Sequence, residues 1–361
     1  MRKNYISLLM FFLFFIGGKK LAQPYHAIVS AEYSNPSLSK IDGIPAFANI
    51  AGALAAVPDN NSEPFIIFIR NGRYYEKLNV DKPHVHFLGE NKERTIITFD
   101  AAGGTLDPNE KKYGTRGCST LRITAPGFVA ENLTVENGFD YPANEAKTRD
   151  DPTRVDSPQA VAIMTDGNND KAVFRNCQFN GYQDTAFLNA GRNYFYMCKI
   201  LGHVDFIFGA GQVVFDKCEI VSRTRKDKNP AGYITAPSTS IKYPYGFLFI
   251  NCRFEKETEE LPKGSVRLGR PWHPGNDQHA SGSAVFMNCY MDDHIGPEGY
   301  APISSRDSTG TRIWYEIKPD SRFFEYGNYG PGALKSEKRP ILDEKSANWY
   351  SAAKVLNGWI P

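Results

Sequence analysis

Two aspartates, Asp184 and Asp205, are the residues of this chain whose type and spacing best suit them to chemistry. They stand 21 residues apart, and the surrounding sequence repeats at about that interval. Repeats of this length are typical of solenoids, in which equivalent positions of neighbouring β-coils lie roughly 4.8 Å apart. Two carboxylates so close repel each other. One then has its pKa raised and can serve as an acid, while the other stays anionic as a nucleophile or base.

A base and two amides complete the arrangement that the spacing predicts. Asp184, Asp205 and Arg225 each follow a repeated cysteine by seven residues, which predicts a column of acid, acid and base. Gln159 lies 24 residues before Gln183, about one coil. Their side-chain amides are therefore expected to direct N–H donors toward a developing oxyanion.

The candidate site draws on four short stretches of chain, namely Gln159–Ala162, Gly181–Thr185, Val204–Gly209 and Leu268–Trp272. Arg270 in the last stretch is expected to hold one of the two carboxylates anionic. The flanking aromatic residues are Tyr182, Phe187, Phe206, Phe208 and Trp272. Any one of these residues alone would suit a structural ladder or ion pair. Their joint occurrence favours a site, although at least one phenylalanine must belong to the core.

The element that must position these residues is a repeated Phe-x-x-Cys-x-apolar unit. Its copies are Phe174/Cys177/Phe179, Phe195/Cys198/Ile200, Phe215/Cys218/Ile220, Phe249/Cys252/Phe254 and Phe286/Cys289/Met291, after a cysteine-free copy at Ala130/Leu133/Val135. Short β-rich units separated by Gly, Asn and Asp turns predict an all-β parallel β-helix.

Segments outside the repeat are expected to close or decorate the solenoid. The Ala-rich stretch 44–57 predicts a helix that caps the open first coil, and 341–356 predicts a second helical segment. Strands are expected at Phe65–Ile69, Val85–Leu88 and Thr95–Thr98. The segments 101–112 and 138–158 interrupt the coils, and such loops on a rigid scaffold usually build a binding site.

The first 22 residues have the pattern of a cleavable signal peptide. Arg2 and Lys3 precede an apolar run from Ile6 to Gly18, which is too short to span a bilayer comfortably. Cleavage is expected after Ala22, which leaves one domain at 23–361; an uncleaved anchor is the alternative. Without the leader, 38 basic residues face 40 acidic ones. That balance gives no argument for nucleic acid or membrane as a partner.

The cysteines and the missing motifs exclude several other chemistries. Five of the six cysteines share one column of the repeat, so most are expected to be free and buried, with one possible bridge between Cys198 and Cys218. There is no Gly-x-Ser-x-Gly elbow, Cys-x-x-Cys, His-Glu-x-x-His or phosphate-binding loop, and neither metal nor cofactor is predicted. His203, two residues before Asp205, is at most a minor influence on the pH response.

Taken together, the four stretches resemble the pectin methylesterases (pectinesterases), particularly bacterial members. Gly181-Tyr-Gln-Asp-Thr, Val204-Asp-Phe-Ile-Phe-Gly and Leu268-Gly-Arg-Pro-Trp carry the resemblance, which extends to Tyr113–Thr120 and to Asn71–Lys77. It implies a right-handed parallel β-helix, without cofactor, that hydrolyses the C6 methyl ester of galacturonate in pectin outside the cytoplasm.

The resemblance also implies a role for each matching residue. Asp205 is similar to the nucleophile, Arg270 to the arginine that keeps it charged, and Asp184 to the general acid/base. Gln159 and Gln183 resemble the oxyanion-hole pair. Substrate contacts are implied for Thr115, Phe187, Phe208, Arg225 and Trp272. Phe187 and Ile303 depart from the Tyr and Met of relatives, which puts subsite preference in doubt.

Two other functions stay open at this point. A β-helix pectate lyase or polygalacturonase would need a calcium-binding acid cluster or further paired acids. A non-catalytic glycan-binding relative would have no reason to keep the complete Gln/Gln/Asp/Asp/Arg set. Capped solenoids of this kind are expected to be monomers.

Overall fold

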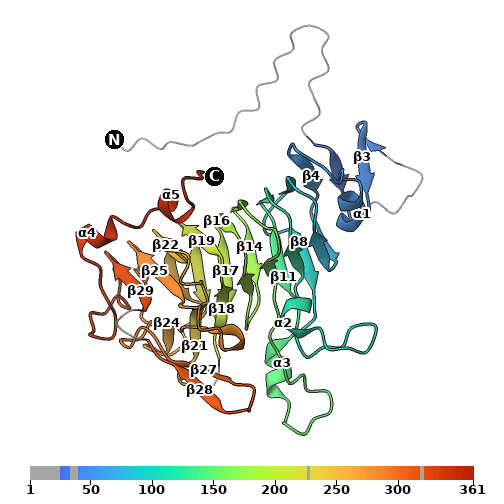
Figure 1. Ribbon diagram of the computed structural model, residues 1–361. Helices are drawn as coiled ribbons and strands as arrows, with labels where there is room; N and C mark the ends of the chain where they lie inside the picture. Colours follow the sequence, from blue (N-terminus) through green and yellow to red (C-terminus); the bar gives the residue numbers. More distant parts are fainter. Residues whose placement is uncertain (1–24, 33–39, 226–227, 318–320) are drawn as a thin grey trace, which may run out of the picture.

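The computed structural model describes residues 25–32, 40–225, 228–317 and 321–361 (Figure 1). Three long sheets of almost entirely parallel strands run along the molecule, and together they form a right-handed parallel β-helix, as predicted. The proposed signal peptide at 1–22 lies outside the described residues. No helix in the described part of the chain is long and apolar enough to cross a membrane.

Each sheet receives about one strand per coil. The twelve-stranded sheet contains, in spatial order, β2 (Lys40–Ile41), β3 (Ile44–Phe47), β1 (Ala27–Val29), β4 (Phe65–Ile69), β7 (Val85–Gly89), β10 (Val129–Glu131), β13 (Ala172–Arg175), β16 (Arg192–Tyr196), β19 (Gln212–Asp216), β22 (Phe247–Ile250), β25 (Ser283–Met287) and β29 (Arg322–Tyr326). The strands predicted at Phe65–Ile69, Val85–Leu88 and Thr95–Thr98 are confirmed as β4, β7 and β8.

The other two sheets close each coil. The eight-stranded sheet contains β26 (Tyr290–Met291), β23 (Arg253–Lys256), β20 (Glu219–Ser222), β17 (Lys199–Gly202), β14 (Gln178–Asn180), β11 (Thr134–Asn137), β8 (Thr95–Phe99) and β5 (Gly72–Tyr75). The seven-stranded sheet contains β24 (Val266–Gly269), β21 (Gly232–Pro237), β18 (Val204–Gly209), β15 (Ala186–Leu188), β12 (Ile163–Thr165), β9 (Leu121–Ile123) and β6 (Leu78–Val80). This third sheet carries the candidate site.

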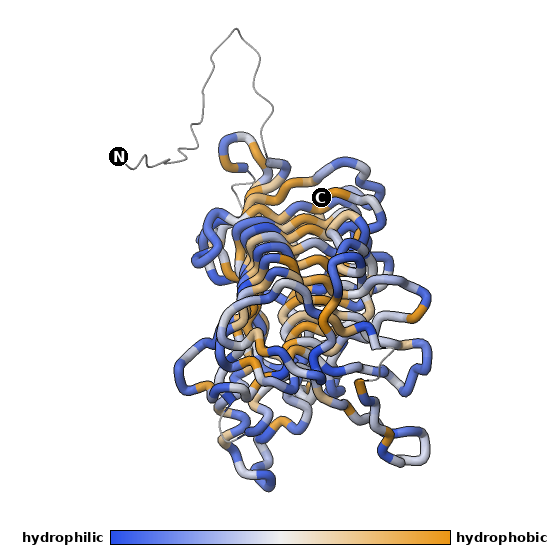
Figure 2. The backbone as a smooth tube through the Cα atoms, turned by 90° about the vertical axis from the view of Figure 1, so that its left-hand side faces the viewer, coloured by the Kyte–Doolittle hydropathy of each residue, from blue (hydrophilic) through white to orange (hydrophobic). Residues whose placement is uncertain are grey.

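The repeated phenylalanines and cysteines line the interior of the coils. The rings of Phe174, Phe195, Phe215, Phe249 and Phe286 stack in sequence, with centroids 4.4 to 5.0 Å apart. Figure 2 shows the apolar segments running through the stacked coils. Since equivalent residues recur once per coil, the aromatic column holds neighbouring coils in register.

All six cysteines are free and buried, so the possible Cys198–Cys218 bridge is absent. Each thiol of the column points instead at the main chain of the preceding coil: Cys198 Sγ donates to Phe174 O at 3.4 Å and Cys218 Sγ to Phe195 O at 3.4 Å. The prediction of free, inward-facing thiols is confirmed.

One left-handed residue per coil turns the chain between the twelve-stranded and eight-stranded sheets. It stands directly before the column position and is asparagine in four of six coils; the set is Asn132, Asn176, Met197, Lys217, Asn251 and Asn288, with φ between 48° and 57°. Asparagine tolerates this conformation better than other non-glycine residues. Met197, whose side chain is 54% exposed, is therefore strained there without a packing benefit.

The N-terminal cap is shorter than predicted. Residues 44–47 form β3, which pairs with β1 and β2, and only Ile50–Ala55 is helical (α1). The helix starts at residue 50 because the side chain of Asn49 accepts from Gly52 N and the Glu76 carboxylate accepts from Ile50 N. Its apolar face joins the core and covers the first coil, as expected of a cap.

The C-terminal segment differs from the continuous helix that 341–356 predicts. It forms two single turns, α4 (Glu344–Ala347) and α5 (Ala352–Val355), each started by its own N-cap, Asp343 and Ser351. Their apolar residues pack on the outer face of the twelve-stranded sheet. A buried ion pair between Arg339 and Glu325, which the sequence did not reveal, fixes the chain before them.

The predicted excursions lie beside the third sheet. Segment 101–112 contains no long strand, and 138–158 contains the helix α3 (Tyr141–Ala146), which was not predicted. The short helix α2 (Gly114–Gly117) stands next to them. In Figure 1 these helices and the hairpin of β27 (Ile303–Arg306) and β28 (Arg312–Tyr315) project from the same side of the coil stack. The short helix η1 (Pro274–Asn276) contacts β27.

The turn analysis predicts that Met197→Asn stabilises the protein. Asparagine relieves the cost of the left-handed backbone, so the free energy of unfolding should rise by about 1 kcal/mol in chemical denaturation. Met197→Gln is the matched control, because it removes the same exposed apolar group without favouring positive φ. Equal stability of the two variants would contradict the explanation.

Candidate active site

Asp184 and Asp205 lie at equivalent positions of adjacent coils, as predicted. Asp184 N donates to Val204 O at 3.1 Å, and Gln183 forms a parallel bridge with Val204. Both aspartates are in the left-handed region, with φ of 66° and 47°. Both side chains are almost fully buried. Backbone strain of this kind costs about 1 kcal/mol or more per residue and concentrates at functional sites.

The unusual backbone of Asp205 changes which side chains face outward. In β18 the pairing with β21 shifts register between Val204 and Ile207, so Phe206 and Ile207 both enter the core while Phe208 faces out. Gly202, the last residue of β17, permits this inward position of Phe206, because a Cβ at residue 202 would come within 2.2 Å of the Phe206 Cβ. The expectation that one phenylalanine of the set is core is confirmed for Phe206.

Arg270 holds Asp205 through a bidentate ion pair. Its Nε donates to Asp205 Oδ1 at 2.7 Å, and Nη2 donates to Oδ2. The guanidinium carbon also lies 4.0 Å from the centre of the Tyr233 ring. Burial lowers the pKa of Arg270, but the Asp205 carboxylate more than offsets it, and the pKa stands above its ordinary value. Asp205 is thus the carboxylate of the two that has a cationic, charge-assisted partner.

Asp184 has the opposite environment. Burial, reinforced by the charge of Asp205 and opposed by Arg270, raises the pKa of its carboxyl well above the ordinary value. No salt bridge to Asp184 is present among the described residues. The two aspartates therefore have different environments: Asp205 has a cationic partner, whereas the raised pKa of Asp184 favours its protonated form. Such an asymmetry suits a nucleophile paired with an acid–base group.

The two glutamines lie on adjacent coils next to this pair. Ala160 N donates to Gln183 O at 3.1 Å, which ties the coil of Gln159 to that of Gln183. The side-chain oxygen of Gln159 is buried and accepts no hydrogen bond from the described residues. A buried amide with an unsatisfied group is costly unless a ligand completes it.

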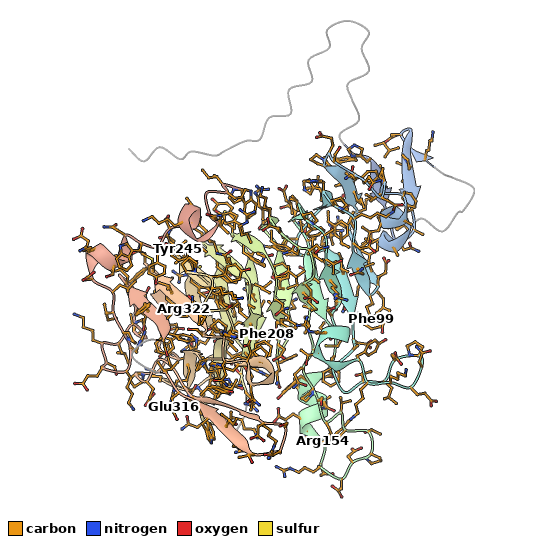
Figure 3. The ribbon with its side chains drawn as sticks, viewed as in Figure 1. Phe99, Arg154, Phe208, Tyr245, Glu316 and Arg322 are labelled. Carbon is orange, nitrogen blue, oxygen red and sulfur yellow. The ribbon has the colours of Figure 1, made fainter. Side chains whose placement is uncertain are left out.

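Three predicted substrate contacts form one aromatic cluster outside the core. The rings of Phe187 and Phe208 stack at 4.2 Å, and Trp272 meets them edge-on at 6.1 and 5.6 Å. Phe208 lies between Phe99 and Glu316 across the middle of the molecule in Figure 3. Phe187 and Phe208 are themselves buried, so Trp272 is the member of the cluster with the more exposed ring.

Arg225 does not continue the column, which is a correction to the predicted order of acid, acid and base. After β20 the chain leaves the coil, and β18 pairs instead with β21, so Val204 is opposite Tyr233. Arg225 lines a cavity of about 690 Å³ together with Tyr141 and His203. The cysteine count failed here because the loop after β20 inserts residues between one coil and the next.

His203 is buried between two tyrosine rings, Tyr141 at 4.4 Å and Tyr182 at 5.6 Å. Burial, with the charges of Arg225 and Arg223, lowers its pKa to about 3. The lowered pKa favours the neutral imidazole. The ring contact with Tyr141 joins His203 to α3.

Thr115 lies in α2, where its carbonyl accepts from Cys118 Sγ at 3.3 Å. Its neighbour Arg116 was missed by the sequence argument. The Arg116 guanidinium lies 5.1 Å from the Phe187 ring centre, and its Nη1 donates to Asp166 at 2.9 Å. Tyr233 was missed as well. The sequence signal for Tyr233 is that it alternates with buried residues in β21, which indicates an outward-facing side chain. That pattern does not reveal that its partner is Arg270.

The comparisons with known proteins agree with this geometry. The pectinesterase family model matches residues 38–358. Pectinesterase A of Dickeya dadantii (strain 3937) is 41% identical over 351 residues, which cover 94% of this chain and 93% of the relative. A pectin methylesterase solved in complex with a hexasaccharide has a TM-score of 0.88 at 41% identity and covers 94% of this chain and 99% of its own. The pectin methylesterase from Yersinia enterocolitica has a TM-score of 0.83 at 45% identity, over 87% and 99% of the two chains.

No group of three or more His, Cys, Asp or Glu side chains in the described part of the chain has the arrangement of a metal site.

The raised pKa of Asp184 predicts that Asp184→Asn stabilises the fold at neutral pH. The unfolded carboxyl titrates near 3.8 and the folded one well above it. Between these values the folded state binds more protons, so wild-type stability falls as pH rises through the window. Asparagine removes that loss, and denaturation midpoints should converge with wild type below about pH 4.

Asp205→Asn is the informative contrast, because it leaves the Arg270 guanidinium buried without its anion. It should destabilise the protein by about 3 kcal/mol at neutral pH. If both substitutions changed stability in the same direction, the division of the two carboxyls into acid and anion would be wrong.

Proposed function

The chain belongs to the pectinesterase family, and on that premise we propose that Asp205 and Asp184 hydrolyse C6 methyl esters of homogalacturonan to pectate and methanol. The observation that carries the proposal is the asymmetry of the pair. Arg270 forms a bidentate ion pair with Asp205, whereas Asp184 is buried without a salt bridge among the described residues and has a raised pKa.

The first step forms an acyl-enzyme. The anionic Asp205 oxygen attacks the ester carbonyl carbon, and the carbonyl oxygen takes up the negative charge. Amide N–H groups of Gln159 and Gln183 donate to that oxyanion. As the intermediate collapses, the C–O bond to the methoxy group breaks, and Asp184 transfers its proton to the departing oxygen to give methanol.

The second step regenerates the enzyme. Asp184 is now a carboxylate and takes a proton from water, whose oxygen attacks the acyl carbon. The bond to Asp205 breaks, which releases the product as a galacturonic acid carboxyl group and restores the Asp205–Arg270 pair; the product then loses its remaining proton to water. Asp184 is again protonated, as its environment favours. Arg270 acts throughout by keeping the nucleophile charged and fixed in orientation.

Substrate contacts are assigned to the residues around the pair. Trp272 presents the exposed ring of the aromatic cluster to a sugar face, and Thr115, Phe187, Phe208 and Arg225 border the path of the polymer. Arg225 adds a positive charge in the cavity beside α3, suited to a carboxylate that has already lost its methyl group.

We expect methanol release from highly methylated pectin to depend on the named groups. Asp205→Asn should abolish release, and Gln183→Ala should lower kcat by about 10² to 10³ while the protein stays folded. Asp216→Asn, a carboxyl on the twelve-stranded sheet that accepts from Tyr194, is the control and should keep full activity. New reducing ends or unsaturated products without methanol would instead identify a polysaccharide hydrolase or lyase.

Export is part of the proposal, because pectin lies outside the cell that makes the enzyme. The segment 1–22 would direct the chain to the periplasm or medium and leave a monomeric domain at 23–361 as the working enzyme. N-terminal sequencing of protein recovered from those fractions should begin at Gln23. Recovery of intact Met1 in a membrane fraction would favour an anchor.

A further inference from the structure

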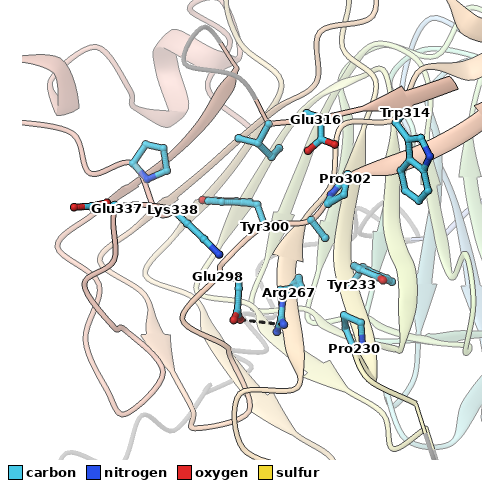
Figure 4. A pocket seen from close by; sticks show the side chains of 13 residues that line it. Pro230, Tyr233, Arg267, Glu298, Tyr300, Pro302, Trp314, Glu316, Glu337 and Lys338 are labelled. Carbon is cyan, nitrogen blue, oxygen red and sulfur yellow. Dashed lines mark ion pairs between the residues drawn. The ribbon is translucent and has the colours of Figure 1, made fainter.

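A cavity of about 980 Å³ has Tyr233, the ring that Arg270 contacts, in its lining (Figure 4). Its size is at the upper end of ligand pockets, which hold roughly 300–1,000 Å³. A bound polymer that passes Arg270 on this side therefore enters the cavity.

An exposed tryptophan forms the outer wall. Trp314 is on β28 of the hairpin, paired with Ser304 of β27, and its side chain is 54% exposed. In Figure 4 its indole stands on the same side of the cavity as Tyr233 and faces away from Lys338. Because this exposed indole also lines the cavity, its face is available to stack on a ligand bound there.

The charges in this cavity disfavour an anionic ligand. The Glu298 carboxylate is neutralised by Arg267, with Arg267 Nη2 at 3.0 Å from Oε2. Of the remaining charged side chains, Glu316 and Glu337 outnumber Lys338. A free galacturonate carboxylate is repelled here, whereas a methyl-esterified unit carries no charge and brings an apolar methyl group.

We propose that Trp314 and this cavity form a distal subsite that takes methyl-esterified galacturonate units of the chain being processed. The inference rests on the proposed function and extends it. The catalytic pair acts on one ester, while Trp314, on the rim of the cavity, contacts a unit further along the polymer. The subsite raises affinity for long, highly methylated chains and leaves the chemical step unchanged.

The test compares Trp314→Ala with Trp349→Ala. Trp349 is equally exposed, at 59%, but follows α4 on the segment that packs on the twelve-stranded sheet. On long, highly methylated pectin, Trp314→Ala should raise KM about three- to ten-fold at unchanged kcat. A methylated trigalacturonate bound at the catalytic pair should not extend to Trp314 on the rim, so on this substrate the variant should behave as wild type. Trp349→Ala should match wild type on both substrates.

Three results would overturn the inference: an unchanged KM on the polymer, an equal rise on the trimer, or the same effect from Trp349→Ala. Trp314→Phe, which keeps an aromatic face, should restore most of the affinity and guards against a misfolded hairpin.

A charge variant tests the preference for esters. Glu316→Gln with Glu337→Gln should lower KM for sparsely methylated pectin by several-fold and leave that for highly methylated pectin unchanged. An equal change on both polymers would contradict charge selection.

Failure of the proposed function has a different signature. If wild type released no methanol from any substrate, polymer binding to the Asp205→Asn protein, followed by tryptophan fluorescence, would still report on the subsite. If the Asp205→Asn/Trp314→Ala double variant no longer binds the polymer, the subsite is supported. If it binds as tightly as the Asp205→Asn protein, the subsite is overturned.

Discussion

The register between successive coils is the constraint on which the rest of this structure depends. Asp184 N bonds to Val204 O, and this one main-chain contact places two carboxyl groups at equivalent positions of adjacent strands. A shift by one residue would turn one aspartate toward the interior. The stacked phenylalanines inside the coils hold that register from Phe174 to Phe286. The apolar core and the catalytic pair are two results of the same periodicity.

Given that register, the chemistry follows from an asymmetry in what reaches each carboxyl. A residue 65 positions further along the chain, Arg270, bonds Asp205 through two donors. Asp184 receives no such partner among the described residues and is buried beside a negative charge. Identical side chains thus acquire different environments, one paired with a cation and one with its pKa raised by burial. The ring of Tyr233 packs against the Arg270 guanidinium. Tyr233 also lines the cavity that Trp314 borders.

Much of this was readable from the sequence because a solenoid converts spacing into proximity. The interval between Asp184 and Asp205 predicted their contact, and the phenylalanine and cysteine columns predicted the core. The same counting failed for Arg225, since a loop after β20 breaks the period. It also failed at both ends, where single side chains such as Asn49 and Asp343 decide where a helix starts. Contacts made by insertions, such as Tyr141 with His203, leave no periodic trace.

The thiol column has a consequence for how the protein copes with redox conditions. None of the six cysteines is cross-linked, and burial raises the pKa of Cys177, Cys198, Cys218 and Cys252 far above the range in which a thiolate forms. Thiolate is the form that exchanges, alkylates and oxidises. A chain of this design needs no oxidative folding machinery and loses nothing to reductants in its surroundings.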